Sequence, residues 1–404
     1  MERRTFIKAS LATMATTMVS PSIMAEKLAK ESNPVRLGFI GCGGRGTGVI
    51  SSMSRNSNMQ IVAMADILQD KLDKALPVLN KLNSGKGLPG IKKSNIYCGV
   101  TAYKELLENK EVDAVLISTP AYAHPFIFEA AVKARKHVYC EKPSAPDVYG
   151  TLQMLKASEG VQNLTMVCGF QIRYSTPFVE MVKRIHSGDI GEIVTAQLFY
   201  NSCEVPMIQT DGSEDEFRLR NHFHYLGLSG GILNDQAIHM LDVCNWVLGT
   251  RPLSAIGAGN RRKSMPFGDA LTNYQVIYTY PKDINVSLQA YQMGPQFGDV
   301  CARFIGTKGW AEAHYSGGVF IKGEKNWQAE NPDGLYDADP NKGRSFIESI
   351  EQKQYLNLIQ DGCDSTLTAL LGREAAFSGK RVFWDELIRE NKRLDTGIDL
   401  LNIK

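Results

Sequence analysis

A glycine-rich loop near the start of the chain restricts the fold more than any other feature. Residues 41–46 read Gly-Cys-Gly-Gly-Arg-Gly, directly after the apolar run 35–40 and before a stretch that we expect to be helical. Glycines at this spacing permit a tight turn, close approach of the backbone to a phosphate, and close packing of the helix on the strand. The start of the helix would then face the anion. The loop therefore predicts a strand, a turn and a helix that together bind a phosphate group.

Short apolar runs alternate with helical stretches in the first part of the chain, which indicates a parallel sheet. The apolar runs are residues 35–40, 61–65, 114–117, 137–140 and 164–168. The expected helices are residues 46–53, 69–79, 124–134 and 146–158. Residues 83–93 are rich in Gly, Lys and Ser, and we expect them to form a surface insertion.

Asp66 closes the second apolar run at the distance from the glycine loop that a dinucleotide site requires. An acidic residue in this place holds the ribose 2′-hydroxyl of NAD and repels the 2′-phosphate of NADP. We therefore expect a Rossmann domain that binds NAD. NADP stays possible, because Arg45 could lie over the adenine or reach a 2′-phosphate across the loop.

The alternation of strands and helices changes after residue 168. We expect a helix at 178–186, a strand at 191–200 and an amphipathic helix at 234–248. Further strands are expected at 254–259, 274–280, 285–291 and 302–305, before helical periodicity returns at 346–391. Neighbouring strands joined by short turns favour an open, largely antiparallel sheet with helices on one face.

These patterns predict an α/β protein in which a Rossmann dinucleotide-binding domain is followed by an α+β domain. We place an export signal and linker at residues 1–34, the NAD-binding domain at 35–168, and a domain for substrate binding and oligomerisation at 169–404. The C-terminal helices can pack back on the first domain.

Composition excludes several other classes of protein. The 404 residues carry a formal net charge of +2, and Lys and Arg are dispersed, so nothing favours nucleic acid as a partner. The eight cysteines contain no CxxC pair, which favours buried free thiols over disulfides or a metal site.

The N-terminal residues are typical of an export signal. Paired arginines at positions 3 and 4 precede a weakly apolar stretch at 9–24, and Ala25 follows. This pattern resembles a twin-arginine signal, which predicts a periplasmic protein without stable membrane insertion after processing. The alternative is an ordinary mobile N-terminus. A twin-arginine substrate folds in the cytoplasm, so a nicotinamide cofactor would have to travel inside the folded protein.

Four segments in the same order resemble the Gfo/Idh/MocA family of oxidoreductases. They are the glycine loop at 41–46, Ser-Thr-Pro at 118–120 with His124, Glu-Lys-Pro at 141–143, and Gly-Gly-Ile-Leu-Asn-Asp at 230–235 with His239. The resemblance extends over nearly all of residues 35–391. It also includes the Gly-Thr-Lys-Gly turn at 306–309.

By this resemblance, Lys142, Asp235 and His239 would be the catalytic residues. His239 would take a hydroxyl proton, Asp235 would hold a substrate hydroxyl or orient the imidazole, and Lys142 would polarise the reacting oxygen. Asp235 and His239 are four residues apart on a predicted helix, so both would lie on one helix face. A neighbouring ammonium group favours the neutral imidazole that a base requires.

The glycine loop and the resemblance together assign further residues to the cofactor and the substrate. Those expected at the cofactor are Gly41, Gly43, Gly44, Arg45, Gly46, Asp66, Ser118, Thr119, Pro120, His124, Glu141, Lys142 and Gln171. Those expected at the substrate are Arg173, His222, His224, Tyr225, Asp235 and His239. His124 could instead only cap the helix that it begins. The loop 203–229 would shape substrate specificity.

A zinc site is a weaker alternative for part of this set. His222, His224, Asp235 and His239 are suitable zinc ligands. However, His-x-His places side chains on opposite faces of a strand, and the family does not generally require a metal, so no metal is expected.

Three functions agree with these residues. The first is NAD-dependent oxidation of a secondary hydroxyl of a sugar, glycoside or cyclitol, with a tightly bound cofactor. The second is redox-neutral cleavage of a glycoside by transient oxidation, elimination and reduction, and the third is a nucleotide-binding regulator without catalysis. The expected partners are a small carbohydrate and other copies of the chain, as a dimer or tetramer formed through the open face of the second sheet.

Overall fold

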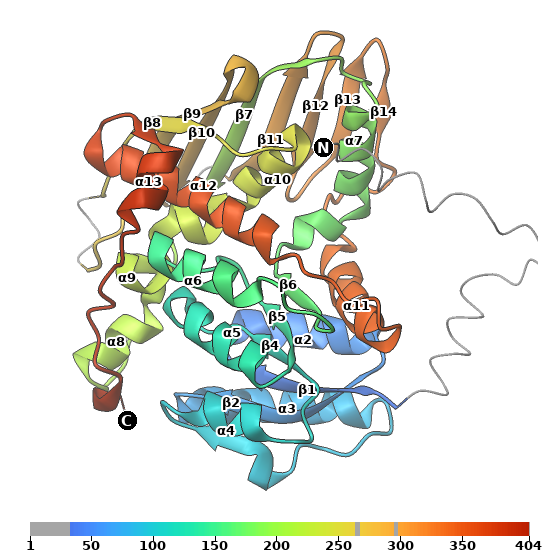
Figure 1. Cartoon of the computed structure of the whole chain (residues 1–404), viewed down its shortest axis with the longest axis vertical. Helices are drawn as coiled ribbons and strands as arrows, with labels where there is room; N and C mark the ends of the chain where they lie inside the picture. Colours follow the sequence, from blue (N-terminus) through green and yellow to red (C-terminus); the bar gives the residue numbers. More distant parts are fainter. Residues whose placement is uncertain (1–32, 263–266, 295–297, 404) are drawn as a thin grey trace, which may run out of the picture. The chain divides into compact units, whose positions relative to one another are not determined.

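The structure is a computed structural model that describes residues 33–262, 267–294 and 298–403. Residues 1–32 of the predicted export signal lie outside the described residues. From Val35 onward, the chain forms one compact unit that contains two sheets (Figure 1). Within this described part, no helix combines the length and the apolar character needed to cross a membrane.

The first sheet has six parallel strands in the order β3-β2-β1-β4-β5-β6, which confirms the predicted Rossmann fold. Its strands are β1 (Val35–Ile40), β2 (Met59–Asp66), β3 (Ile96–Cys98), β4 (Ala114–Ile117), β5 (His137–Cys140) and β6 (Met166–Cys168). The sequence analysis missed β3, because it has only three residues and none of them is fully buried. The order reverses between β1 and β4, and ligands of such sheets bind at the carboxyl ends of the strands there.

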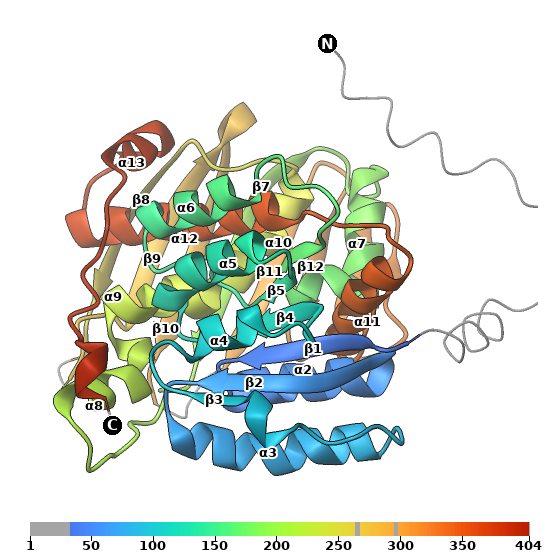
Figure 2. The same ribbon diagram turned by 60° about the horizontal axis from the view of Figure 1, so that its bottom comes forward.

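Helices cover both faces of the first sheet, which explains why its strands are apolar throughout. They are α2 (Gly44–Asn56), α3 (Gln69–Ser84), α4 (Ala102–Glu108), α5 (His124–Lys133) and α6 (Val148–Ser158). One core lies under α2 and α3, and another lies under α4, α5 and α6 (Figure 2). The predicted surface insertion at 83–93 is wrong at its start, because Asn83 is buried at the end of α3 and its side chain bonds the backbone N–H and carbonyl of Ile61.

The second sheet has nine strands in the order β14-β13-β12-β11-β7-β10-β9-β8-β15. Its strands are β7 (Ile193–Ser202), β8 (Ser254–Asn260), β9 (Asn273–Tyr280), β10 (Ile284–Gln292), β11 (Asp299–Gly306), β12 (Gly309–His314), β13 (Val319–Gly323), β14 (Trp327–Gln328) and β15 (Val382–Phe383). The sheet is largely antiparallel, as predicted, although its central pair β7 and β10 runs parallel. The analysis missed β12 to β15, two of which have only two residues.

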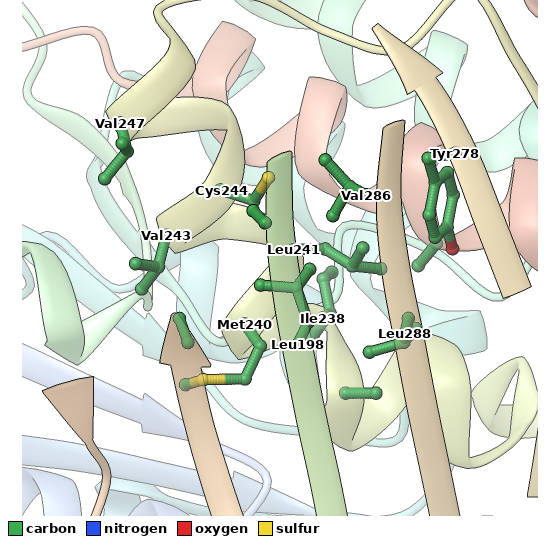
Figure 3. Close-up of a cluster of buried hydrophobic side chains, with 14 of the residues drawn as sticks. Leu198, Ile238, Met240, Leu241, Val243, Cys244, Val247, Tyr278, Val286 and Leu288 are labelled. Atoms are coloured by element: carbon green, nitrogen blue, oxygen red, sulfur yellow. The ribbon is translucent and has the colours of Figure 1, made fainter. Parts of the chain in front are cut away.

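Helices cover one face of the second sheet. They are α7 (Thr176–His186), α10 (Ile238–Leu248) and α12 (Ile359–Ser378), and their side chains meet Leu198, Val286 and Leu288 of the sheet in the core (Figure 3). The structure differs in two respects from the amphipathic helix that was expected at 234–248. It begins with a π-helical turn, η5 (Leu233–Ala237), and it is buried almost all round, because the sheet covers one side and α12 covers another.

The remaining helices lie outside these two sets. They are α8 (Glu214–Arg220), α9 (Leu226–Ser229), α11 (Ala338–Glu351) and α13 (Trp384–Glu390). In α11, Phe346 and Ile347 belong to the core under α2, while α12 packs on α6. The predicted helical stretch 346–391 is interrupted by β15, which pairs with β8 at the edge of the second sheet.

Candidate active site

The glycine loop connects β1 to α2 at the carboxyl end of the first sheet. Gly41 has φ +87°, and a Cβ there would lie 2.6 Å from the backbone nitrogen of Thr119. A Cβ on Gly46 would lie 1.9 Å from Oγ of Ser118. These two glycines therefore permit the loop after β1 to approach the loop after β4. By contrast, a Cβ on Gly43 or Gly44 would meet nothing within 4 Å, so the backbone is open to a ligand there.

A cavity of about 370 Å³ begins at this loop and continues between the two domains. The first domain contributes the open glycines, Asp66, the 118–120 turn, Glu141 and Lys142 to its wall. The second domain contributes Asp235 and residues of the 205–224 segment. The cavity therefore brings most of the residues that the sequence assigned to cofactor and substrate into one space.

Asp66 lines the cavity at the end of β2. One carboxylate oxygen accepts a hydrogen bond from the backbone N–H of Cys42 at 2.6 Å, and the other accepts from that of Leu68 at 2.9 Å. Burial raises the pKa of this carboxyl group, while the two backbone bonds oppose the rise. The carboxylate is therefore held beside the glycine loop, at the place expected for a ribose-binding acid.

Arg45 lines the cavity, as predicted for a cofactor-site residue, but it also forms contacts that the sequence did not indicate. Its guanidinium forms an ion pair with Asp339 at 3.2 Å, lies 3.7 Å from Glu141, and donates to the Gln171 side-chain oxygen at 3.4 Å. The side chain borders the cavity, but its charge is directed at carboxylates rather than at an adenine or a 2′-phosphate. Arg45, the residue that kept NADP possible in the sequence analysis, thus links α2 to α11 through Asp339.

Glu141 lies at the end of β5 in a buried network of charges. Its Oε1 is 3.5 Å from Nζ of Lys342 and 3.2 Å from the hydroxyl of Tyr139. Although burial alone would raise its pKa, the charges of Lys342 and Arg45 hold the pKa below the ordinary value. Its Oε2 is buried and bonds to no other described group, so it can accept a hydrogen bond from a ligand in the cavity.

Lys142 and Asp235 meet across the two domains. Nζ of Lys142 lies 3.9 Å from Oδ2 of Asp235 and donates a hydrogen bond to the Asp235 backbone carbonyl. Each side chain is 12% exposed, so this contact is largely shielded from water. Asp235 lies in the π turn η5, and π turns occur frequently at functional sites because they redirect side chains. The geometry therefore brings two of the three predicted catalytic residues into contact.

His239 lies one turn further along, at the start of α10, but its ring does not line the cavity. The ring packs near Phe170 and Tyr315, with centroid distances of 6.2 Å and 5.7 Å. Burial and then the charge of Lys142 lower its pKa well below the ordinary value. Nδ1 is buried and has no hydrogen-bond partner among the described residues. The imidazole is therefore neutral and can accept a proton at this atom.

His124 joins two loops behind the cavity wall. One ring nitrogen lies 2.7 Å from the carbonyl of Pro143, and the other lies 2.8 Å from the carbonyl of Thr119. The ring does not line the cavity, and the Lys142–Pro143 peptide bond beside it is cis. In place of the predicted cofactor contact, His124 ties the loop after β5 to the loop after β4.

Gln171 and Arg173 lie in the turn after β6, outside the cavity wall. Gln171 donates to the Tyr315 hydroxyl at 2.6 Å. The predicted substrate contact of Arg173 is not what the structure shows. Its guanidinium donates to both oxygens of buried Asp242 at 2.9–3.1 Å and pairs with Asp361 at 3.0 Å, so its donors are engaged inside the protein.

The 203–229 loop supplies His222 and His224, which line the cavity, whereas Tyr225 does not. The two histidines lie in a short 3-10 turn, so the argument that treated them as strand residues is wrong. Burial lowers the pKa of each. In the part of the chain that the structure describes, the side chains grouped closely enough for a metal are Asp299, Cys301 and His314, not the four residues considered for zinc.

The sequence analysis missed several residues of the cavity wall. Aromatic and aliphatic side chains face the space beside Asp66, together with two cations: Lys71, Tyr103, Tyr122, Phe126, Ile208, Leu219, Arg220 and Leu400. The elements after β2, β3 and β4 contribute four of them. A strand-end rule could have found those. The predicted specificity loop 203–229 contains Arg220, but nothing in the sequence indicated that Leu400 returns to this cavity.

The cavity fits NAD on three observations. The open backbone at Gly43 and Gly44 admits a pyrophosphate at the start of α2. Asp66 stands at the ribose position. The buried Oγ1 of Thr119 has no bond to any other described group, so it is available to a ligand at the Lys142 end.

Two models of one family match the chain. The model described as an oxidoreductase family with an NAD-binding Rossmann fold matches residues 35–168, and the model of the GFO/IDH/MocA C-terminal domain matches residues 178–312. These stretches together cover more than half of the chain. They confirm the family that the four sequence segments indicated.

Two relatives of established classes align with the chain. A glycosyl hydrolase family 109 protein of Solibacter usitatus is 26% identical over 316 residues, which are 73% of this chain and 70% of that protein. The inositol 2-dehydrogenase of Rhizobium meliloti is 27% identical over 236 residues, which are 58% of this chain and 62% of that protein. The chain thus spans less than two thirds of the inositol dehydrogenase.

A solved structure confirms the fold. The scyllo-inositol dehydrogenase of Lactobacillus casei, solved with NAD(H) and scyllo-inositol, superimposes with a TM-score of 0.68 at 20% identity, over 87% of this chain and 99% of that one. The cavity, the two family models and this fold agree. The chain belongs to the Gfo/Idh/MocA family, and it is an NAD-dependent oxidoreductase that acts on CH–OH groups.

Proposed function

We propose that the protein oxidises a secondary hydroxyl of a sugar, glycoside or cyclitol while NAD stays bound. The observation that carries this proposal is the contact of Lys142 with Asp235 in the wall of the cofactor cavity. A cation and a carboxylate side by side suit a substrate that has adjacent hydroxyl groups. The names of the inositol dehydrogenase and glycosidase relatives agree with such a polyhydroxyl substrate.

The roles of the three residues follow from their surroundings. NAD, held by the glycine loop and Asp66, would supply the hydride acceptor for the reacting carbon. The Lys142 ammonium stabilises the negative charge that develops on the reacting oxygen, since shielding from water strengthens this interaction. His239, kept neutral by burial and by Lys142, takes the hydroxyl proton at Nδ1. Because the ring lies outside the cavity wall, this step requires the ring to turn towards the substrate. Asp235 accepts a hydrogen bond from a second hydroxyl and thereby orients the ring.

We further propose that the protein works in the periplasm after export by the twin-arginine route, as a dimer or tetramer. Free NAD is not expected there, so one cofactor molecule must serve many turnovers. Reduced cofactor is then reoxidised by a second substrate or within the same catalytic cycle. The paired arginines at positions 3 and 4 support the export step.

Mass spectrometry of the denatured, purified protein tests the cofactor and substrate class directly. We expect NAD or NADH at close to one equivalent, and NADH formation when the protein is mixed with a cyclitol or an aldose. A protein that is purified without nucleotide and binds added NAD weakly would contradict retention. A protein that holds nucleotide but reduces none with any polyhydroxyl compound would contradict the dehydrogenase.

Redox-neutral cleavage of a glycoside is the second candidate, because a glycosyl hydrolase family 109 protein aligns over 73% of this chain. In that reaction, transient oxidation acidifies a neighbouring C–H, elimination releases the leaving group, and reduction completes the cycle. An aryl glycoside distinguishes the two candidates. Release of the phenol without net NADH supports cleavage, whereas a stable keto-glycoside supports the dehydrogenase.

A further inference from the structure

One end of the cofactor cavity is walled by residues from outside the Rossmann domain. Ile208, Leu219 and Arg220 of the 205–224 segment line it, together with Leu400 from the C-terminal residues. Asp66, which marks the adenosine half of a bound NAD, lines the same cavity. In two views that differ by 60°, α8 and the C-terminal turn lie side by side (Figures 1 and 2). We call residues 205–224 and 394–403 together the nucleotide strap.

Arg220 fastens the strap to the first domain. Its guanidinium forms a two-pronged contact with Asp70 on α3, at 2.8 Å and 3.3 Å, and a further bond of 2.7 Å with Glu216 of its own helix. The arginine side chain is 15% exposed. A bidentate arginine–carboxylate contact is stronger than a single-pronged ion pair, although solvent still reaches Asp70, whose side chain is 35% exposed. Besides burial, the charge of nearby Asp70 raises the pKa of the Asp66 carboxyl group, so the contact fastens the strap close to Asp66.

The second part of the strap is held by several contacts of the C-terminal residues. The backbone N–H of Leu394 donates to Asp147 at 2.7 Å, and the side chain of Asn402 donates to Asp215 of α8 at 2.9 Å. Gly227 permits close packing here, because a Cβ would lie 1.9 Å from the carbonyl of Asp395. These bonds place Leu400 against the cavity, while its neighbour Leu401 is 83% exposed.

We infer that the nucleotide strap binds the adenosine half of NAD and retains it between turnovers. This inference rests on the proposed function, in which one cofactor molecule stays bound. An NAD molecule in the cavity meets the first domain on one side and the strap on the other. It leaves only after the Arg220–Asp70 contact separates and Leu400 moves aside, so the strap governs the rate of release.

The release rate of NADH from the full-length protein tests the strap. Protein loaded with NADH is mixed with excess NAD, and the loss of NADH fluorescence is followed in time. Two matched pairs of variants separate the strap from its surroundings. Arg220→Ala removes the contact, whereas Lys74→Ala removes the exposed second partner of Asp70. Leu400→Ser alters the cavity wall, whereas Leu401→Ser alters its exposed neighbour.

We expect the unaltered protein to release NADH slowly. Arg220→Ala and Leu400→Ser should release it about tenfold faster or more, and a tenfold change corresponds to about 1.4 kcal/mol. Lys74→Ala and Leu401→Ser should stay within about twofold. The double variant Asp70→Asn with Arg220→Ala should release no faster than Arg220→Ala alone, because both changes remove the same contact. Circular dichroism shows that each variant is folded.

Two results would overturn the inference, and they can be told apart. If the unaltered protein releases NADH slowly and all four single variants do the same, retention holds but the strap does not cause it. If the unaltered protein itself releases NADH rapidly, then the proposed retention fails and the strap fails with it.

Discussion

Lys142 donates a hydrogen bond to the backbone carbonyl of Asp235, a residue 93 positions away, and its ammonium lies 3.9 Å from the Asp235 carboxylate. The first residue ends a strand of the cofactor domain, and the second lies in the π turn of the other domain. One cation thus connects the cofactor side of the cavity to the substrate side. The relative position of the two domains therefore decides whether the catalytic residues meet.

Lys142→Met should abolish turnover but leave NAD bound. Loss of the ammonium removes the charge that stabilises the developing alkoxide, which lowers kcat by about 10²–10³-fold. Calorimetric titration with NAD should give an affinity close to that of the unaltered protein. Lys136→Met, at a half-buried lysine between β4 and β5 that is not in the cavity wall, is the control and should leave kcat unchanged. Equal turnover in both variants would exclude the proposed role of Lys142.

The pH dependence should report the lowered pKa of His239. Because burial and Lys142 both disfavour the imidazolium, the neutral base persists as pH falls, and the acid limb of kcat/KM lies below pH 6.5. The unfolded chain takes up this proton near pH 6.5, so the contribution of His239 to stability decreases below that pH. NMR titration of the His239 ring gives the pKa directly.

Replacement of the same lysine should change this titration in a known direction. In Lys142→Met the repulsion of the imidazolium is removed, so the pKa of His239 should rise, although burial still holds it below the ordinary value. An unchanged pKa would mean that the two groups do not interact. His239→Gln should lower kcat by about 10²–10⁴-fold and remove the acid limb.

Two glycines of the same loop should respond differently to alanine. Gly43→Ala adds a methyl group in open space, so the free energy of unfolding should change by less than about 1 kcal/mol. The same methyl group hinders the pyrophosphate, and NAD affinity should fall about tenfold or more. Gly46→Ala instead forces a contact of 1.9 Å with Ser118, which should destabilise the protein by about 1–3 kcal/mol.

Urea unfolding of the cofactor-free protein and NAD titration separate these two effects. The prediction fails if Gly43→Ala loses stability as much as Gly46→Ala does, or if it binds NAD as tightly as the unaltered protein.

Arg173→Ala should affect folding rather than substrate binding. The change leaves Asp242, which is 0% exposed, without its main charged partner, and breaking a buried pair costs about 3–5 kcal/mol. Asp242→Asn in the same chain should restore part of this stability, because the unpaired charge is gone. KM at a temperature where the variant is folded should be unchanged. A raised KM with unchanged stability would instead place Arg173 at the substrate.

The sequence predicted those parts of the structure that depend on local patterns. The strand, glycine loop and helix around Gly41 follow from short-range rules, as does the position of Asp66 at a strand end. The contact of Lys142 with Asp235 required the family resemblance, because two residues that far apart share no local pattern. The small strands β3 and β12 to β15 were missed, since their pairing depends on neighbours rather than on their own composition.

The sequence could not reveal which partners the charged side chains bind. Arg45 and Arg173 both follow cofactor-domain strands and were assigned to ligands, yet a half-buried carboxylate pairs with Arg45 and a buried one pairs with Arg173. Those carboxylates, Asp339 and Asp242, come from helices of the other domain. An arginine pairs with whichever carboxylate the tertiary fold brings near, and one sequence without its fold does not contain that information.

The central strands of the second sheet, β7 and β10, run parallel, and paired residues such as Thr195 and Asn285 are far apart in the chain. Parallel neighbours cannot form from a hairpin, so a long loop must close before this pair forms. Such non-local pairing slows folding. Asp235 and His239 lie within that loop, so we expect the catalytic groups to reach their places only after the slowest step of folding is complete.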